Sequence, residues 1–204
     1  MPGPREQAFD RAIRIERGRV TAMGFFSDMM RRAQGLPTES DVRMALQGLQ
    51  NQIMMLTNMA DAMDSAAAGT EFEDTFGFAL RFDLMNFALH IAAADGVLEP
   101  SEVQAINMML GSDFTYGQCK KAIEEQGLGS DELSYGMPRS FMLLTAFAHG
   151  TTPSAKAKEF SESLISTYEA LGLVIANVDG DFDESEQRDL ERYISMLRMW
   201  ASKF

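Results

Sequence analysis

The chain has 204 residues, of which 46% are hydrophobic, so it is long enough to bury a sizeable core as one domain. Its formal net charge is −12 and its pI about 4.6, so its surface repels nucleic acid and anionic membranes and attracts divalent cations or basic partners. The single cysteine, Cys119, excludes an intramolecular disulfide and a zinc site built from several thiolates, which fits a reducing compartment.

The N-terminal part of the sequence gives no sign of a membrane or export segment. No stretch approaches the roughly 18 consecutive apolar residues of a spanning helix, and the N-terminus lacks an uninterrupted apolar signal region. We therefore expect a soluble, cytoplasmic protein that can associate peripherally with a membrane through a protein partner. Residues 1–37 are predicted to be an extension with a short amphipathic helix, in which Phe9, Ile13 and Val20 stand at loose helical spacing among arginines.

The remaining residues, 38–204, are predicted to form one all-α domain. Alternating Val/Ile/Thr runs bounded by hairpin turns are missing, and Ala, Met, Leu and Glu dominate the periodic segments. The first helix should follow a cap at Thr38 or Ser40 and run through the fifties and sixties. Six more helices are expected, at about Asp74–Ala94, Pro100–Leu110, Tyr116–Glu125, Arg139–His149, Ser154–Val178 and Glu184–Ser202. Seven helices joined by short connections predict a single compact bundle.

Helical spacing indicates which residues face the core of that bundle. Four methionines of the first helix stand at such spacing and are assigned to the core rather than to a binding groove. The predicted helices Asp74–Ala94 and Arg139–His149 have comparable apolar faces. The expected core residues are Met54, Met55, Met59 and Met63; Leu80, Leu84, Phe87 or Ala88, and Ile91; and Phe141, Leu144, Thr145 and Ala148.

A short acidic block occurs twice, and it is the most informative pattern in the chain. Residues 95–102 read DGVLEPSE and residues 179–186 read DGDFDESE, 84 positions later. Each block follows a long apolar-periodic stretch, so the repeated unit is larger than the block. We therefore predict a duplicated helix-loop-helix with a pseudo-twofold relation between its two acidic loops.

The acidic loops carry the oxygen ligands that hard divalent cations prefer. Each block matches the second half of an EF-hand loop, whereas the first half fails, so neither loop alone supplies the six to eight oxygens of a calcium site. Two half-sites brought together by the duplication would pool their carboxylates and suit calcium, magnesium or manganese. The candidate metal ligands are Asp95, Glu102, Asp179, Asp181, Asp183 and Glu186.

Helix capping is an alternative explanation of the same residues. Gly96 and Gly180 are placed as left-handed C-caps. Glu99 or Asp183 at the N-cap, with Glu102 or Glu186 at the third helical position, makes a capping box. The helix dipole alone favours a carboxylate there by roughly 0.3–1 kcal/mol. Capping does not explain why six acids lie within residues 179–189. Such closely spaced carboxylates repel one another, which is unfavourable. Both interpretations therefore remain open, with the second loop the better metal candidate.

The repeated pattern resembles the TerB-like tellurite-resistance family, which also includes the N-terminal region of DjlA-type co-chaperones. A long helix enters A-D-G-V-L-x-x-x-E at residues 94–102 and V-D-G-D-F-x-x-x-E at residues 178–186. The resemblance covers roughly residues 40–202 and implies an internally duplicated bundle of about seven helices. It also implies acidic loops that bind a divalent cation, a stress-response role through protein partners, and no catalysis. The first copy departs from the pattern, because Val97 and Pro100 stand where the second copy has acids.

The remaining reactive residues do not form a catalytic motif. His90 is expected to be hydrogen-bonded or half-exposed rather than a metal ligand, and Cys119 an unreactive thiol. Neither a G-x-S-x-G motif nor a phosphate-binding glycine loop occurs. A metal-dependent hydrolase using the pooled carboxylates lacks an evident base or nucleophile and ranks last. We therefore expect a protein that is not an enzyme.

Overall fold

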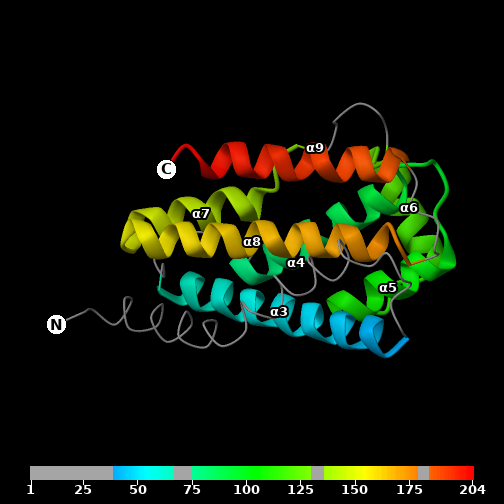
Figure 1. Cartoon of the computed structure of the whole chain (residues 1–204), viewed down its shortest axis with the longest axis horizontal. Helices are drawn as coiled ribbons and strands as arrows, with labels where there is room; N and C mark the ends of the chain where they lie inside the picture. Colours follow the sequence, from blue (N-terminus) through cyan, green and yellow to red (C-terminus); the bar gives the residue numbers. More distant parts are fainter. Residues whose placement is uncertain (1–38, 67–74, 130–135, 179–183) are drawn as a thin grey trace.

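The computed structural model describes residues 39–66, 75–129, 136–178 and 184–204 (Figure 1). The predicted N-terminal extension, residues 1–37, lies outside them. Every regular element in the described part is an α-helix, as predicted. The seven helices are α3 (Glu39–Ala66), α4 (Phe76–Ala92), α5 (Pro100–Leu110), α6 (Tyr116–Gln126), α7 (Arg139–Thr151), α8 (Ser154–Ile175) and α9 (Glu184–Ala201).

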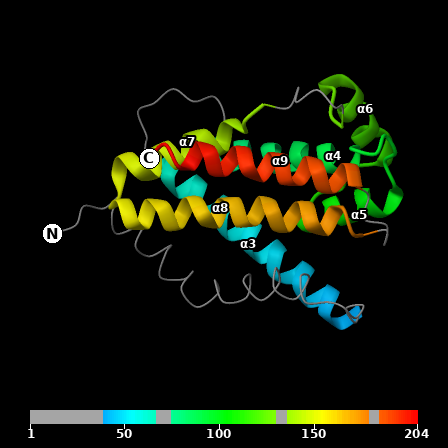
Figure 2. The same cartoon turned by 45° about the horizontal axis from the view of Figure 1, so that its top comes forward.

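Helix α4 lies at the centre of the bundle, because its sequence is apolar on nearly every side. It contacts each of the other six described helices. Twelve of its seventeen residues are buried, whereas a surface helix would bury only one stripe. The helix begins after Thr75, whose hydroxyl accepts the Phe78 N–H at 3.2 Å. The other helices therefore pack around α4 into one compact bundle (Figures 1 and 2).

An aromatic cluster forms the middle of the core. The Phe87 ring of α4 meets Tyr168 of α8 at a centroid distance of 5.1 Å and Tyr193 of α9 at 4.6 Å. Phe141 of α7 reaches Tyr168 edge-on at 6.3 Å. All four side chains are fully buried. Such rings dominate core energetics through their large buried area, so this cluster ties α4, α7, α8 and α9 together.

The predicted core faces of α4 and α7 are confirmed, and that of α3 needs one correction. Every residue named for α4 and α7 is buried. In α3, Met59 and Met63 are buried and Met55 is partly buried, but Met54 is 58% exposed. Met54 follows the buried Ile53 and therefore lies outside the core-facing stripe.

The helices begin and end at the predicted residues or within three residues of them. Pro100 opens α5, and Gly127 closes α6 with a left-handed φ of +63°. α4 and α8 end at Ala92 and Ile175, two and three residues before the predicted ends. In both, the chain continues in tighter i→i−3 turns, such as that from the Ala94 N–H to the Ile91 carbonyl at 3.0 Å.

The C-terminal turn of α9 is fastened to α7 by polar and aromatic contacts. The Trp200 indole N–H donates to the Thr145 hydroxyl at 3.2 Å. Phe204 stacks on the His149 ring at 4.9 Å between centroids. Lys203 places its ammonium 4.6 Å from the centre of the indole ring, within the range of a cation–π contact. The chain's single tryptophan therefore lies at the α7–α9 contact.

No helix among the described residues is long and apolar enough to cross a membrane. The ends of α4 and α8 and the starts of α5 and α9 gather at one end of the bundle in both views (Figures 1 and 2). These four helix ends flank the two acidic loops.

Candidate functional site

The first acidic loop is held by hydrogen bonds that its backbone N–H groups donate to nearby carboxylates. The Asp95 carboxylate accepts the Val97 N–H at 2.7 Å, and Gly96 between them takes a left-handed φ of +89°. The Glu102 carboxylate accepts the Glu99 N–H at 2.6 Å across the first turn of α5. These contacts confirm the predicted capping box at the start of α5.

The two first-loop candidates differ in their access to solvent. Asp95 is exposed, whereas Glu102 is only 3% exposed. Each uses one carboxylate oxygen for the hydrogen bond described above. A carboxylate has two oxygens with about four acceptor positions, so the Val97 N–H occupies one of the positions of the exposed Asp95 carboxylate.

The second acidic loop is described only through its flanks. Asp179, Asp181 and Asp183 lie outside the described residues, so their expected part in a metal site stays a prediction. Glu186, in the first turn of α9, is 5% exposed, almost the same as its repeat counterpart Glu102. The chain enters the loop through Asn177, whose side-chain amide donates to the Leu173 carbonyl at 2.7 Å.

A buried histidine joins the flanks of the two loops. His90, in the last turns of α4, is 3% exposed, and its Nε2 lies 3.7 Å from an Asp189 carboxylate oxygen of α9. The backbone N–H of Gly129, after α6, donates to His90 Nδ1 at 3.0 Å. Arg192 lies 3.7 Å from the other oxygen of Asp189. The end of α4 and the start of α9 are therefore in direct contact.

The electrostatics around His90 favour a neutral imidazole. Burial lowers the pKa of His90, the Asp189 carboxylate opposes this by raising it, and Arg192 lowers it again. An Nδ1 that accepts the Gly129 N–H cannot carry a proton of its own, so the neutral ring has its N–H at Nε2, toward Asp189. The prediction that His90 is hydrogen-bonded is confirmed. Its ring is buried, however, and not half-exposed.

Gly129 occupies a position that other residues would strain. Its φ is +74°, and a Cβ added there would run into the Ala93 carbonyl at the end of α4. The Gly129 N–H is therefore held directly against the last turn of α4, where His90 accepts it. No sequence pattern indicates Gly129 or Asp189 as a partner of His90, because they lie 39 and 99 residues away along the chain.

Another buried acid, Asp83, lies earlier in α4 than His90. Asp83 accepts the Ser140 N–H at 2.7 Å, one of the backbone groups that the start of α7 leaves without an intrahelical partner. Burial raises the pKa of Asp83, while the hydrogen bonds from Ser140 and the charge of Arg139 act to lower it. Asp83 therefore caps α7 from a neighbouring helix, a role that sequence spacing alone did not indicate.

The described residues contain no set that would hold a metal on its own. No group of three or more His, Cys, Asp or Glu side chains with suitable geometry occurs in the described ranges. Cys119 is buried, and burial raises the pKa of its thiol, which favours the unreactive form that the sequence analysis expected.

No family model matches the sequence, no curated protein matches it, and no solved structure matches the fold.

Proposed function

We propose that the protein is a non-enzymatic, TerB-like helical protein that binds a divalent cation at its paired acidic loops and acts through protein partners. The observation that supports this proposal best is the 3.7 Å contact between His90 and Asp189. It joins the end of α4 to the start of α9, so the flanks of the two loops lie at the same end of the bundle. Carboxylates from both loops would then be near enough to share one counter-charge.

The ligand set favours a hard cation. Asp179, Asp181 and Asp183 would provide most of the oxygens, and Asp95, Glu102 and Glu186 would complete the set. Calcium, magnesium and manganese prefer such ligands. Two further features agree with a duplicated origin: Glu102 and Glu186 stand 84 positions apart and are equally buried.

A second candidate function is a structural or adaptor bundle that binds no metal. The hydrogen bonds of Asp95 and Glu102 favour it, because each carboxylate already stabilises its own loop. In that case Glu102→Ala lowers the free energy of unfolding by about 0.5–2 kcal/mol and leaves any effect of calcium unchanged.

Calorimetric titration of the full chain with calcium chloride and manganese chloride tests the proposal. We expect heat of binding and a rise in Tm for the native sequence, and loss of both when Asp179, Asp181 and Asp183 are all changed to Asn. The control variant carries Asp113→Asn, Glu124→Gln and Glu162→Gln, three exposed acids elsewhere, so it removes the same charge.

The two candidates predict different results in this experiment. Equal weakening in both triple variants would mean that cations only screen the acidic surface, and absence of heat in the native protein would favour the structural bundle. Retention of binding in the Asp179/Asp181/Asp183 variant would overturn the assigned site.

A further inference from the structure

The outer side of α3 lacks the charges that a solvent-facing helix usually carries. From Met44 to Ala60, seventeen consecutive residues include no Asp, Glu, Lys or Arg. The opposite side packs into the core through residues such as Leu49, Ile53 and Leu56. The outer face of α3 consists of residues that point away from that core at helical spacing: Met44, Gln47, Gly48, Asn51, Met54 and Asn58.

Two large apolar side chains are exposed on this face. Met44 is 63% exposed and Met54 58% exposed. Gly48 lies between them, and a Cβ added there would meet nothing within 4 Å. Depletion of charge together with enrichment of Met is the composition of protein interfaces rather than of free surface. The outer face of α3 therefore has the character of a surface that another helix covers.

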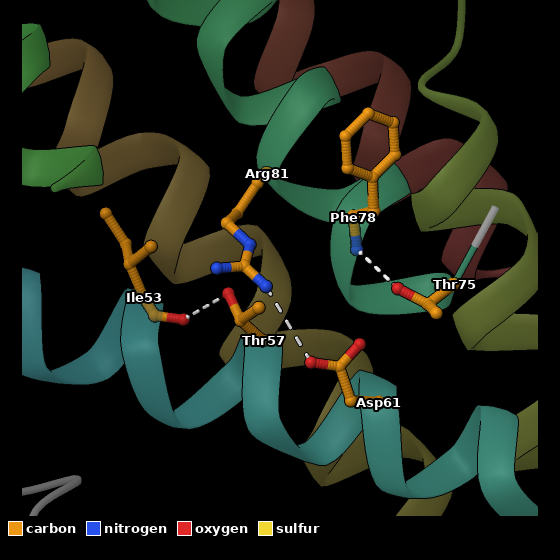
Figure 3. Close-up of polar contacts among 6 residues, drawn as sticks. All are labelled: Ile53, Thr57, Asp61, Thr75, Phe78 and Arg81. Carbon is orange, nitrogen blue, oxygen red and sulfur yellow. Dashed lines mark hydrogen bonds and ion pairs between the residues drawn. The ribbon is translucent and has the colours of Figure 1, made fainter. Parts of the chain in front are cut away.

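Charge reappears only where this face ends. Figure 3 shows Arg81 of α4 reaching Asp61 of α3, at 3.8 Å between nitrogen and oxygen. One turn earlier, the Thr57 hydroxyl turns back to donate to the Ile53 carbonyl at 2.8 Å. The uncharged stretch thus has a defined C-terminal limit at Asp61.

The segment of the chain that directly precedes α3 has a matching apolar face. In residues 22–34, Ala22, Phe25, Phe26, Met29 and Ala33 recur at intervals of three and four, with Met23 and Met30 beside them. The polar residues Ser27, Asp28, Arg31 and Gln34 fall on the opposite side of a helical wheel, and Arg32 lies at the edge of the apolar face, beside Phe25. Gly35-Leu36-Pro37 then breaks the pattern immediately before α3 begins at Glu39.

We propose that residues 22–34 form a helix that folds back antiparallel onto the outer face of α3. A connection of two to five residues is typical of such an αα-hairpin, and residues 35–38 provide four. Pairing residue 34 with residue 39 fixes the register. Met29 then lies against Met44, and Phe25 and Phe26 lie against Gln47 and Gly48, where the glycine gives an aromatic ring room to approach.

Tethering and charge both favour this occupant over a separate protein. A four-residue connection makes the contact intramolecular, with an effective concentration in the millimolar range. Residues 1–38 carry seven arginines against four acids, whereas the whole chain has a net charge of −12, so the segment is attracted to the acidic remainder. A 13-residue helix is about 20 Å long, so it covers the face from Met44 to Asn51 and leaves Met54 and Asn58 uncovered.

A spin label on the full chain tests the docking directly. Gln50→Cys places the label at the edge of the outer face, and Ser195→Cys places it on α9, at the opposite edge of the bundle in Figure 1. We expect the Gln50→Cys label to broaden the amide resonances of residues 22–34 and the Ser195→Cys label to leave them sharp. The buried Cys119 leaves the introduced cysteine as the accessible thiol.

A matched pair of substitutions tests the register. Gly48→Leu fills the space for the aromatic ring, whereas Asn58→Leu adds a similar side chain beyond the predicted end of the contact. We expect Gly48→Leu to reduce the hydrogen-exchange protection of residues 22–34 at least about tenfold, and Asn58→Leu to leave it unchanged. Both substitutions suit an exposed helical position, so both variants should fold.

Three results would overturn the proposal. One is the absence of broadening in residues 22–34 with the Gln50→Cys label. Another is broadening confined to residues 9–20, which would assign the face to a different part of the chain. The third is broadening in a mixture of spin-labelled and isotope-labelled molecules, because that would identify the occupant as a second copy.

Discussion

His90 links three distant parts of the chain through its two ring nitrogens. Its Nδ1 accepts the Gly129 N–H, and its Nε2 faces Asp189, which Arg192 also approaches. Protonation at Nδ1 would set two N–H groups against each other, so the native state favours the neutral ring. The environment of a single residue therefore couples the stability of the acidic end to pH.

We expect the free energy of unfolding to decrease as the pH falls below about 6.5. Burial lowers the pKa of His90 in the native state below its ordinary value of about 6.5, so in the window just below that value the unfolded chain binds more protons than the native chain. The slope contributed by this one group is at most about 1.4 kcal/mol per pH unit. Urea unfolding at a series of pH values measures it.

The variant His90→Asn tests whether His90 causes this pH dependence of the free energy of unfolding. Asn keeps an acceptor near the Gly129 N–H but does not titrate, so its unfolding free energy should depend less on pH than that of the native protein. His149→Asn removes the chain's other histidine and is the matched control. An unchanged pH slope in His90→Asn would contradict the assignment.

A second prediction for a single residue concerns the buried carboxylate of Asp83. Asp83→Ala should lower the free energy of unfolding by about 1–3 kcal/mol, because it leaves the buried Ser140 N–H without its acceptor. Asp83→Asn keeps an acceptor oxygen and removes a buried charge, so it should stay within about 1 kcal/mol of the native protein. Chemical denaturation at pH 7 compares the two, and equal losses would rule out the hydrogen bond as the cause.

At the scale of the helices, close packing depends on a glycine inside α8. A Cβ at Gly172 would press against the Leu190 side chain of α9 and lie 3.1 Å from the Phe87 ring of α4. All three residues are buried, so the neighbours have little room to yield. Gly172 thus sets how closely α8 approaches both helices.

We expect Gly172→Ala to lower the free energy of unfolding by about 1–3 kcal/mol through overpacking. Gly117→Ala in α6 is the matched control, because a Cβ there meets nothing within 4 Å. That substitution should raise stability by about 0.5–1 kcal/mol, since alanine favours helix more than glycine. Thermal unfolding compares the pair, and a Gly172→Ala variant as stable as Gly117→Ala would contradict the packing argument.

The helix boundaries followed from local signals, whereas their tertiary contacts did not. Pro100 and Gly127 mark helix ends by backbone geometry alone, and the structure has them there. The contacts of His90 depend on how α4, α9 and the segment after α6 come together, and no periodicity along the chain encodes that. Met54 shows a related limit: its spacing fits a core stripe, but its neighbour Ile53 occupies the inward position.

The candidate cation site was predictable only in part. The repeated acidic block identified Glu102 and its capping partner Glu99, because a capping box is a local pattern. The contact that brings the two loops' flanks together involves Asp189, one of the six acids within residues 179–189 but without a counterpart in the first copy. A pattern sought by repetition could not single out a residue that is not repeated.

For the whole molecule, the net charge of −12 is the dominant electrostatic feature. Like charges on one compact body repel each other, and salt screens this repulsion over a Debye length of about 10 Å at 0.1 M. We expect the urea midpoint to rise when sodium chloride increases from about 10 mM to about 150 mM. The measurement is made with a chelator present, so that specific binding of divalent cations does not contribute.

Choline chloride should give the same rise as sodium chloride, because screening depends on ionic strength and not on the identity of the cation. A midpoint that falls with salt would instead indicate that attractive pairs, such as Arg198 with Glu169 at 3.1 Å, outweigh the general repulsion.

The position of Trp200 gives the intact protein a built-in optical reporter. Its indole ring is held between the Thr145 hydroxyl and the Lys203 ammonium, where α9 meets α7. Because no other tryptophan is present, the emission spectrum comes from this one contact. Separation of α9 from α7 would expose the indole ring to solvent and shift its emission to longer wavelength. Fluorescence can therefore follow the release of this helix without any added dye.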